Sequence, residues 1–212
     1  MSETGSIKFR CDHVPKPPVH FAEFDELNHY RRRLIDLAVV GIDASGIGFG
    51  NLSVRVGLTS EFYITGTGTG GLSALTPTDF SKVVAYDFAK NWLRCEGTRL
   101  ASSESLTHAA VYESDLTVRA VIHCHDEKLW GALLHSAPAT PGNADYGTPE
   151  MAYAVKDLLA IPDKFERRII VMTAHRGGLI TFGENPAKAF SVLIQNGCAE
   201  RAHPRRRFQI DD

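Results

Sequence analysis

The sequence predicts an α/β protein in which helices cover the faces of a mostly antiparallel sheet. Short runs at 51–56 and 62–65 alternate between apolar and polar residues and are joined by a tight turn, which is typical of antiparallel strands. Helix signals, such as helical apolar spacing and caps followed by proline, occur between such runs. The 212 residues, 43% of them apolar, favour a single domain with a large core.

The chain is expected to begin with an extended arm, residues 1–22, followed by one domain, residues 23–212. The arm cannot be helical over 14–19, where three of the six residues are proline. A helix is then expected from about Asp25 to Gly41. Apolar residues between these two positions recur at helical spacing, and glycine is a common helix end.

The remaining elements follow from local signals. Thr148 and Asn185 each precede a proline, and a capping side chain followed by proline is a strong helix start. Ser102 or Ser103 is the expected cap of a helix over 104–112. Further strands are expected at 83–87, 92–95, 119–125, 169–172 and 179–182, and further helices at 128–134, from 148, and from 185 to about 199.

The charge balance argues against nucleic-acid binding as a general function. The formal net charge is −2, and acidic and basic residues are mixed along most of the chain. A nucleic-acid binder would instead show a basic stripe. The one charged run, three arginines at 205–207, is expected to be a solvated tail. We therefore expect no nucleic-acid partner.

Cysteine use and hydropathy favour the cytoplasm. The four cysteines form no CxxC pair and are too sparse for a disulfide framework, so reduced thiols are the simpler interpretation. The polar N-terminus has no apolar signal segment behind it, and no window reaches the length of a membrane span. A cytoplasmic protein that does not contact a membrane is expected.

The apolar run before residue 123 ends in His123-Cys124-His125. Side chains alternate along a strand, so both histidines should point to one face and Cys124 to the other. Two imidazoles on one strand can supply two of the three ligands of a catalytic metal site. The best third candidate is His175, because glycines at 177 and 178 would let the backbone pass close to a metal. Ordinary polar residues at a strand end are the alternative.

Two further segments have features of an anion site. Ser102-Ser103-Glu104 opens a predicted helix, whose free N–H groups and dipole could hold a phosphate beside Glu104. A capped helix with an acid in its first turn is the alternative. The glycine-rich loop 66–71 follows a strand, but it has no Walker lysine. It is therefore neither a P-loop nor a dinucleotide fingerprint, and a flexible turn is its simpler interpretation.

The order of these motifs resembles the class II aldolase/adducin family. The matching blocks are 50–55, 64–68, 102–104 with His108, 123–125, and His175 with Gly178 and Gly183. The resemblance covers the chain from about Asp25 to Ala199. It implies an α/β/α sandwich around a largely antiparallel sheet. It also implies a homo-oligomer, usually a tetramer, with active sites at subunit interfaces.

The resemblance also implies a role for each matched residue. His123, His125 and His175 would bind a divalent metal, usually Zn²⁺, with Mn²⁺ or Co²⁺ as alternatives. Glu104 would lie at the metal and move protons. The residues that would hold a substrate phosphate are Asn51, Thr67, Gly68, Ser102 and Ser103.

The implied function is that of a metal-dependent, aldolase-type lyase acting on a small hydroxy-carbonyl compound such as a sugar phosphate. The metal would stabilise the enediolate formed when a carbon–carbon bond breaks. An epimerase or dehydratase using the same site is an alternative, because both reactions share the enediolate. A non-catalytic, adducin-like interaction module is a third possibility, although retention of the three histidines and Glu104 argues against it.

The sequence departs from the family's sugar-phosphate aldolases in three places. The segment between His125 and residue 147 is short, whereas in those aldolases it is longer and carries a catalytic tyrosine. Tyr146 lies near the corresponding region. His175 is followed by Arg176, where many members have glycine, and the arm over 1–22 is extra. The metal site is therefore expected to be intact, while the acid–base partner and substrate are left open.

Overall fold

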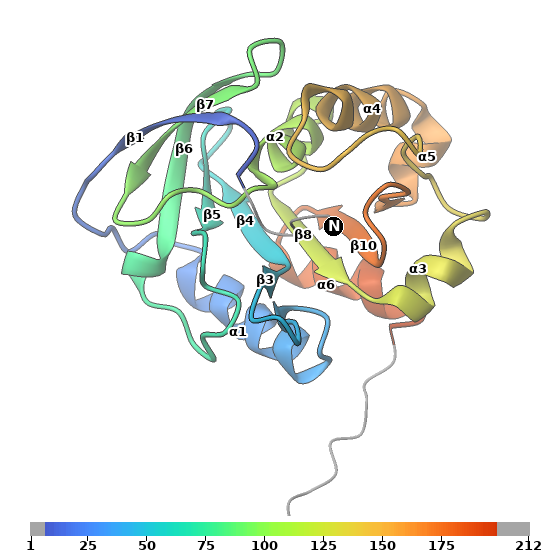
Figure 1. Ribbon diagram of the computed structural model, residues 1–212, viewed down its shortest axis with the longest axis horizontal. Helices are drawn as coiled ribbons and strands as arrows, with labels where there is room; N and C mark the ends of the chain where they lie inside the picture. The colour runs from blue at the N-terminus through green and yellow to red at the C-terminus, as the bar shows by residue number, and fades with distance from the viewer. Residues whose placement is uncertain (1–6, 199–212) are drawn as a thin grey trace, which may run out of the picture.

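The computed structural model describes residues 7–198 and has a central eight-stranded sheet with helices on both faces (Figure 1). The strand order is β1-β7-β6-β5-β4-β8-β10-β9, and every pair except β1–β7 is antiparallel. The strands are β1 (Arg10–Val14), β4 (Asn51–Arg55), β5 (Phe62–Thr65), β6 (Phe80–Asp87), β7 (Trp92–Gly97), β8 (Ala120–His125), β9 (Ile169–Val171) and β10 (Gly178–Gly183), and the short strands β2 (Gly41–Ile42) and β3 (Gly48–Phe49) form a separate pair. The helices are α1 (Phe24–Asp36), α2 (Ser105–Ser114), α3 (Glu127–Leu133), α4 (Pro149–Leu159), α5 (Pro162–Glu166) and α6 (Pro186–Gln195), with one 3₁₀ turn over Pro77–Asp79.

Two apolar cores, one on each face of the sheet, hold the layers together. Helices α2 and α4 cover one face with buried side chains that include Leu106, Val111 and Met151. Helices α1 and α6 cover the opposite face with residues such as Leu27 and Leu193. Figure 1 shows these two helix pairs on opposite sides of the strands. The predicted α/β/α sandwich with a mostly antiparallel sheet is therefore confirmed.

The expected helix starts at residues 148 and 185 are confirmed. Thr148 accepts a hydrogen bond from the N–H of Met151, and Asn185 accepts one from the N–H of Lys188. These side chains satisfy N–H groups in the first turn, which have no partner within the helix.

The first helix is shorter than expected, since it ends at Asp36 rather than near Gly41. Ala38 has a φ of 59°, and the N–H of Val39 donates to the carbonyl of Leu34. This hydrogen bond is typical of a Schellman helix end. The left-handed backbone of Ala38 stops the helix inside the range that the spacing of apolar residues predicted.

The expected serine cap of α2 is wrong. Glu104 occupies the N-cap position, and no side chain caps the helix. The N–H of Ser105 instead donates to the backbone carbonyl of Ser102. Strand β6 also differs from its expected bounds and begins at Phe80, because that residue already pairs with Thr65 of β5.

Part of the expected N-terminal arm joins the sheet as β1. It pairs in parallel with β7, with Cys11 opposite Leu93 and His13 opposite Cys95. β1 is therefore an edge strand of the main sheet (Figure 1). The arginine run at 205–207, which was expected to be a solvated tail, lies outside the described residues.

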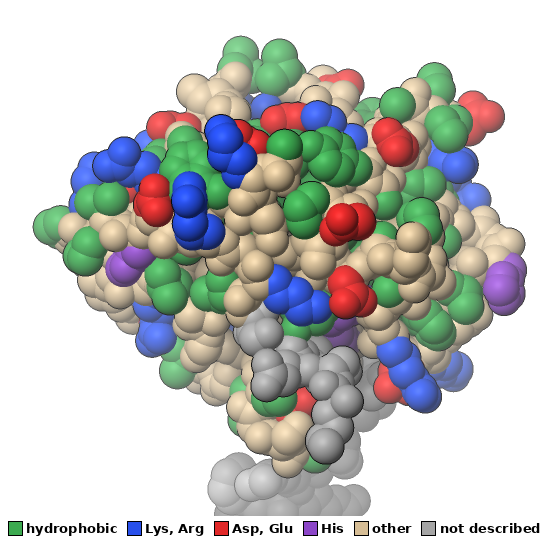
Figure 2. All heavy atoms as spheres, turned by 45° about the horizontal axis from the view of Figure 1, so that its top comes forward, with side chains coloured by type: hydrophobic (Ala, Val, Ile, Leu, Met, Phe, Trp, Pro, Cys, Tyr) green, Lys and Arg blue, Asp and Glu red, His purple; other side chains and the backbone are tan. Residues whose placement is uncertain are grey.

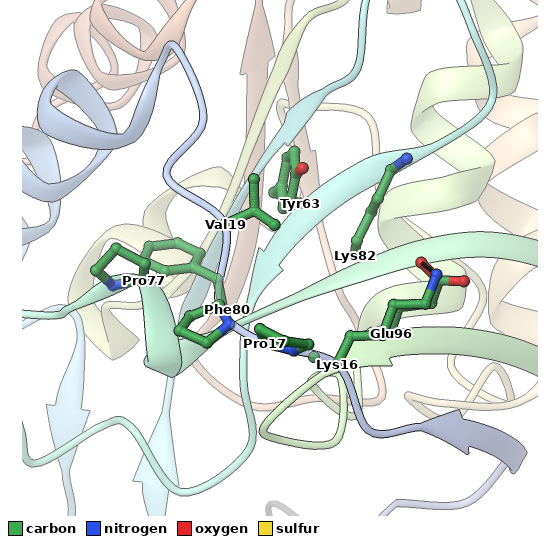
Figure 3. A pocket seen from close by; sticks show the side chains of 10 residues that line it. Lys16, Pro17, Val19, Tyr63, Pro77, Phe80, Lys82 and Glu96 are labelled. Carbon is green, nitrogen blue, oxygen red and sulfur yellow. Dashed lines mark ion pairs between the residues drawn. The ribbon is translucent and has the colours of Figure 1, made fainter.

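The proline-rich stretch after β1 borders a pocket of about 240 Å³. Figure 3 shows Pro17 and Val19 of this stretch near Tyr63 and Phe80 of the sheet. At the rim, Lys16 Nζ forms an ion pair with a Glu96 carboxylate oxygen at 2.7 Å. None of the residues that line this pocket belongs to the candidate site described below.

The surface has no large region of one charge on the face shown in Figure 2, where acidic and basic side chains are interspersed. This distribution agrees with the formal net charge of −2. Within residues 7–198, no helix has both the length and the apolar character that a membrane crossing requires.

Candidate metal centre

Three histidine side chains converge at one end of the sheet. His123 and His125 come from the end of β8, and His175 comes from the turn between β9 and β10. The Nε2 atom of His125 lies 3.1 Å from Nε2 of His123 and 2.8 Å from Nε2 of His175. The ligand atoms of all three lie within 4.8 Å of one another.

The alternation predicted for the end of β8 is confirmed. The rings of His123 and His125 lie on the same face with centroids 4.9 Å apart. Cys124 is buried in the core on the opposite face, beneath α1 and α6. A period of two along the strand therefore separates the site from the core.

The position of His175 depends on a tight turn that requires glycine. Gly178 pairs with His125 at the start of β10, and its N–H donates to the carbonyl of His175 at 2.7 Å. A Cβ atom at Gly178 would lie 2.5 Å from Cδ2 of the His175 ring. Any other residue at 178 would therefore push the ring out of its place.

The three imidazoles are neutral near pH 7. Burial lowers the pKa of His125 to about 4 and that of His175 to about 3, and it holds the pKa of His123 well below its ordinary value. Nδ1 of His123 lies 3.1 Å from the carbonyl of Leu179, so Nδ1 carries the hydrogen and donates it. Nε2 of His123 then keeps its lone pair, which is the form that ligates a metal.

This donor set fits a divalent transition metal. With Zn–N bonds of about 2.0–2.1 Å in a tetrahedral site, ligand nitrogens are separated by roughly 3.3 Å. The observed Nε2 separations of 3.1 and 2.8 Å are only slightly shorter. Three histidines also leave a fourth position open, as catalytic zinc sites do, and imidazole suits several transition metals.

Glu104 is a buried carboxylic acid with one oxygen free of hydrogen bonds. Its Oε2 accepts a hydrogen bond from the Thr107 hydroxyl at 2.7 Å, while Oε1 is buried and has no partner among the described residues. Burial raises the pKa of Glu104 to about 7, although Thr107 and the charge of Lys8 act in the opposite direction. A pKa in this range suits a group that must both take and return a proton.

Packing of α2 on β4 places Glu104 at the end of α2 nearest the histidines. His108 Nδ1 lies 2.7 Å from the Ser53 hydroxyl. Glu104 lies one turn before His108 on α2. Asn51 lies two residues before Ser53 and on the same face of β4. Asn51 pairs directly with His123, so the two side chains share a face. Glu104 therefore lies at the end of α2 that faces this pair.

The five residues expected to bind phosphate converge on one pocket of about 190 Å³. Asn51 comes from β4, Thr67 and Gly68 from the glycine-rich loop, and Ser102 and Ser103 from the segment just before α2. Because Asn51 pairs with His123, the pocket lies beside the histidine cluster. Their role in phosphate binding stays a prediction.

The buried Arg31 side chain forms hydrogen bonds with backbone carbonyls of the glycine-rich loop. Its side chain is 1% exposed, and its guanidinium donates to the carbonyls of Thr69 at 2.6 Å, Leu72 at 2.5 Å and Gly70 at 3.3 Å. Burial lowers its pKa to about 10, so it remains charged at neutral pH. Arg55, on the neighbouring strand β4, does not serve the pocket, because its guanidinium donates to the carbonyl of Val118.

The structure adds two side chains to the site. The ring of Tyr146 lies 4.8 Å from the ring of His175, and Lys8 Nζ lies 3.9 Å from the centroid of the Tyr146 ring. The sequence interpretation noted Tyr146 without aligning it and assigned no role to Lys8. No local pattern marks Lys8, because a contact with residue 146 depends entirely on the tertiary fold.

The fold and the centre define an α/β/α protein with a three-histidine cluster beside a polar pocket. Residues 43–196 match the family model described as the Class II Aldolase and Adducin N-terminal domain. Since this match spans more than half of the chain, the protein belongs to the class II aldolase/adducin family. The resemblance found in the sequence is thereby confirmed. None of the curated proteins matches the chain.

Solved structures share this fold at low sequence identity. An L-fuculose 1-phosphate aldolase is 22% identical with a TM-score of 0.63, covering 84% of this chain and 82% of its own. L-fuculose-1-phosphate aldolase from Thermus thermophilus is 22% identical with a TM-score of 0.58, covering 82% and 88%. A sugar-phosphate aldolase from Thermotoga maritima is 16% identical with a TM-score of 0.57, covering 84% and 94%.

Proposed function

We propose that this protein is a divalent-metal-dependent lyase that breaks a carbon–carbon bond in a small hydroxy-carbonyl compound. The observation that carries the proposal is the convergence of three neutral imidazoles at one end of the sheet. Family membership and the shared fold with sugar-phosphate aldolases support it. A sugar phosphate is the substrate class that this proposal favours.

His123, His125 and His175 would hold the metal, with Zn²⁺ favoured and Mn²⁺ or Co²⁺ as alternatives. When bound, the ion would supply positive charge to a carbonyl group and to the enediolate that forms as the neighbouring bond breaks. The hydrogen bond of His123 Nδ1 to the Leu179 carbonyl would fix the orientation of that ligand.

Glu104 would carry the proton transfer. In its ionised form it can take a proton from a substrate hydroxyl, and in its protonated form it can return a proton to the enediolate carbon. Its buried Oε1 has no partner among residues 7–198, so this atom is available to a substrate group. The Thr107 hydroxyl holds the other oxygen and fixes the orientation of the carboxylate.

The pocket beside the cluster would hold the substrate phosphate. Asn51, Thr67, Gly68, Ser102 and Ser103 would provide amide, hydroxyl and backbone N–H donors around it. Arg99 lies near the glycine-rich loop, since its Nη1 is 4.0 Å from the position of a Cβ at Gly68, but its Nε is paired with an Asp79 carboxylate oxygen at 2.9 Å. The phosphate would therefore be held mainly by the neutral donors of the pocket.

The proposal includes assembly into a homo-oligomer, with a tetramer as the expected form. Family membership supports this assembly together with a small-molecule substrate. Light scattering of the purified protein would measure the molar mass against 23.3 kDa per chain. A monomer at micromolar concentration would contradict this part of the proposal.

Product analysis tests the reaction directly. Zinc-loaded and metal-free protein would be incubated with a panel of ketose phosphates and their unphosphorylated sugars, and the products would be identified by NMR. We expect two carbonyl fragments from a phosphorylated substrate, and only with metal. An epimer or loss of water would instead identify the epimerase or dehydratase alternatives. Failure to bind metal, together with no turnover, would contradict the proposal and favour an adducin-like interaction module.

A further inference from the structure

A pair of cysteines lies at the N-terminal edge of the sheet, outside the candidate metal centre. Cys11 is on β1 and Cys95 is on β7, and their Sγ atoms are 3.3 Å apart. His13 is the direct partner of Cys95 in this parallel pair. Because Cys11 lies two residues before His13, it is on the same face of the sheet as Cys95.

The two thiols differ in solvent access and are joined by a hydrogen bond. Cys95 is fully buried, whereas Cys11 is half-buried, so a reagent reaches the pair through Cys11. Either sulfur can donate the hydrogen bond that joins them. This bond stabilises a thiolate in the pair and lowers the pKa of Cys95 to about 7, while the pKa of Cys11 is raised. When the Cys11 proton passes along this hydrogen bond to the Cys95 thiolate, the accessible Cys11 sulfur becomes the thiolate.

The strand that carries Cys11 is an edge strand, hydrogen-bonded to β7 on one side. A disulfide requires an S–S distance of about 2.05 Å, so the two sulfurs must approach by roughly 1.3 Å from their separation of 3.3 Å. Among the strands of residues 7–198, β1 lies at the edge of the sheet and pairs only with β7. An edge strand held from one side can make such a shift more easily than a central strand.

We propose that Cys11 and Cys95 are a modification site at which a hydroperoxide forms a reversible disulfide between β1 and β7. The Cys11 sulfur attacks the peroxide, its O–O bond breaks, and one oxygen leaves as water or as an alcohol. The Cys95 sulfur attacks the resulting sulfenic acid and loses its proton, the S–S bond forms, and the leaving hydroxide takes up that proton to become water. Two thiols are oxidised by two electrons in total, and one peroxide is reduced.

The disulfide would fix the chain segment that reaches the candidate metal centre. Lys8 lies two residues before β1, and its Nζ contacts the Tyr146 ring. The bond would also close a loop between residues 84 positions apart, and a loop of that length constrains the unfolded chain strongly. This modification does not rest on the proposed function, because its geometry and its test concern the thiols alone.

Thiol counting and peptide mapping test the proposal on the full chain. Reduced protein would be treated with one to a few equivalents of H₂O₂ and then unfolded under conditions that trap free thiols. We expect the thiol count to fall from four to two and the intact mass to fall by about 2 Da, with a mapped peptide pair joining Cys11 to Cys95. Dithiothreitol should restore four thiols.

Two variants and a melting experiment complete the design. Cys11→Ser should form no such link, whereas Cys198→Ala, which alters a buried cysteine elsewhere, should still form it. The oxidised wild type should melt higher than the reduced protein by about 5 °C or more. The proposal is overturned if the treated wild type gains oxygen without a link, keeps four thiols, or links Cys124 to Cys198 instead. Mapping of the wild type decides this even if a variant fails to fold.

Discussion

Lys8 Nζ lies 3.9 Å from the centroid of the Tyr146 ring, and the same ring lies 4.8 Å from that of His175. A residue that the sequence interpretation assigned to an extra arm therefore places a positive charge beside the candidate metal centre. That charge lowers the pKa values of both Glu104 and His175. The arm is thus expected to affect the chemistry of the site.

Replacing Lys8 by Met should shift the pH dependence of turnover. Without the cation, the pKa of Glu104 rises, because Lys8 no longer favours its ionised form. The acid limb of the kcat profile should then move to higher pH, while Lys8→Arg should keep the wild-type profile. Lys16→Met is a matched control, since Lys16 lies on the same segment but pairs with Glu96 away from the site. An unchanged profile in Lys8→Met would exclude this role.

Removing two ligands should abolish metal binding without unfolding the chain. Purified wild type should contain about one divalent ion per chain by elemental analysis, and the His123→Ala/His125→Ala variant should contain none. The exposed His135 offers a control, because His135→Ala should keep the ion. Chelation should also lower the Tm of wild type but not that of the double variant. Wild type without metal after incubation with zinc, manganese or cobalt would contradict the centre.

Glu104→Gln should keep the metal and the fold but lose turnover by about 10²–10⁴-fold. The amide preserves the shape and can still bond Thr107, but it cannot take a proton. Glu113→Gln on the same helix is the matched control, because Glu113 lies at the surface in an ion pair with Lys156. If Glu104→Gln turned over as fast as wild type, another group would have to move the proton.

Acid should destabilise the fold through the buried His108, whose pKa burial lowers to about 3. Its stabilising contribution is present above its unfolded pKa near 6.5 and is lost progressively as pH falls toward 3, because the unfolded chain binds the proton first. Between pH 7 and pH 5 this amounts to about 2 kcal/mol. Glu104, with its raised pKa, acts in the opposite sense.

Comparison of His108→Asn with wild type separates these two effects. Both proteins contain Glu104, so the difference between their unfolding free energies measures the contribution of His108 alone. We expect denaturant titrations to show that wild type loses about 2 kcal/mol more than the variant from pH 7 to pH 5. Asparagine keeps a polar group near Ser53, the present partner of His108. Equal losses would mean that His108 becomes protonated within the folded protein.

Arg31→Met should weaken the response of the protein to phosphate. The guanidinium holds three carbonyls of the glycine-rich loop and its following residue, and their loss as partners should cost about 1–3 kcal/mol of stability. Inorganic phosphate should raise the Tm of wild type and raise that of Arg31→Met less. Arg32→Met is the neighbouring control on the exposed side of α1. No phosphate effect on wild type would argue against a phosphorylated substrate.

Much of the fold could be predicted from the sequence because its signals are local. The alternation around Cys124 assigned each histidine of β8 to the correct face, and the caps at Thr148 and Asn185 marked two helix starts. β1 was not recognised as a strand of the sheet. Its residues 10–14 alternate weakly, and the prolines that follow dominated the interpretation.

The site could be predicted only as a set of candidates. Whether His175 meets His123 depends on the pairing of β10 with β8, a long-range register that no local window contains. The contributions of Lys8 and Arg31 are harder still to predict from the sequence, because each residue contacts others that lie far away along the chain. Resemblance to a family supplied roles for matched residues, but it could not supply these contacts.

The pairing of β1 with β7 also sets an order for assembly. Residues 10–14 are made before their partner strand, Trp92–Gly97, which lies about 80 residues further along the chain. Synthesis at about 5–20 residues per second delays that partner by several seconds, and closing so long a loop is slow compared with forming a hairpin. β1 must therefore wait for β7, a strand made much later. A nascent chain stalled before residue 92 would thus expose β1 without a partner, and Lys8 would lack its place at the site.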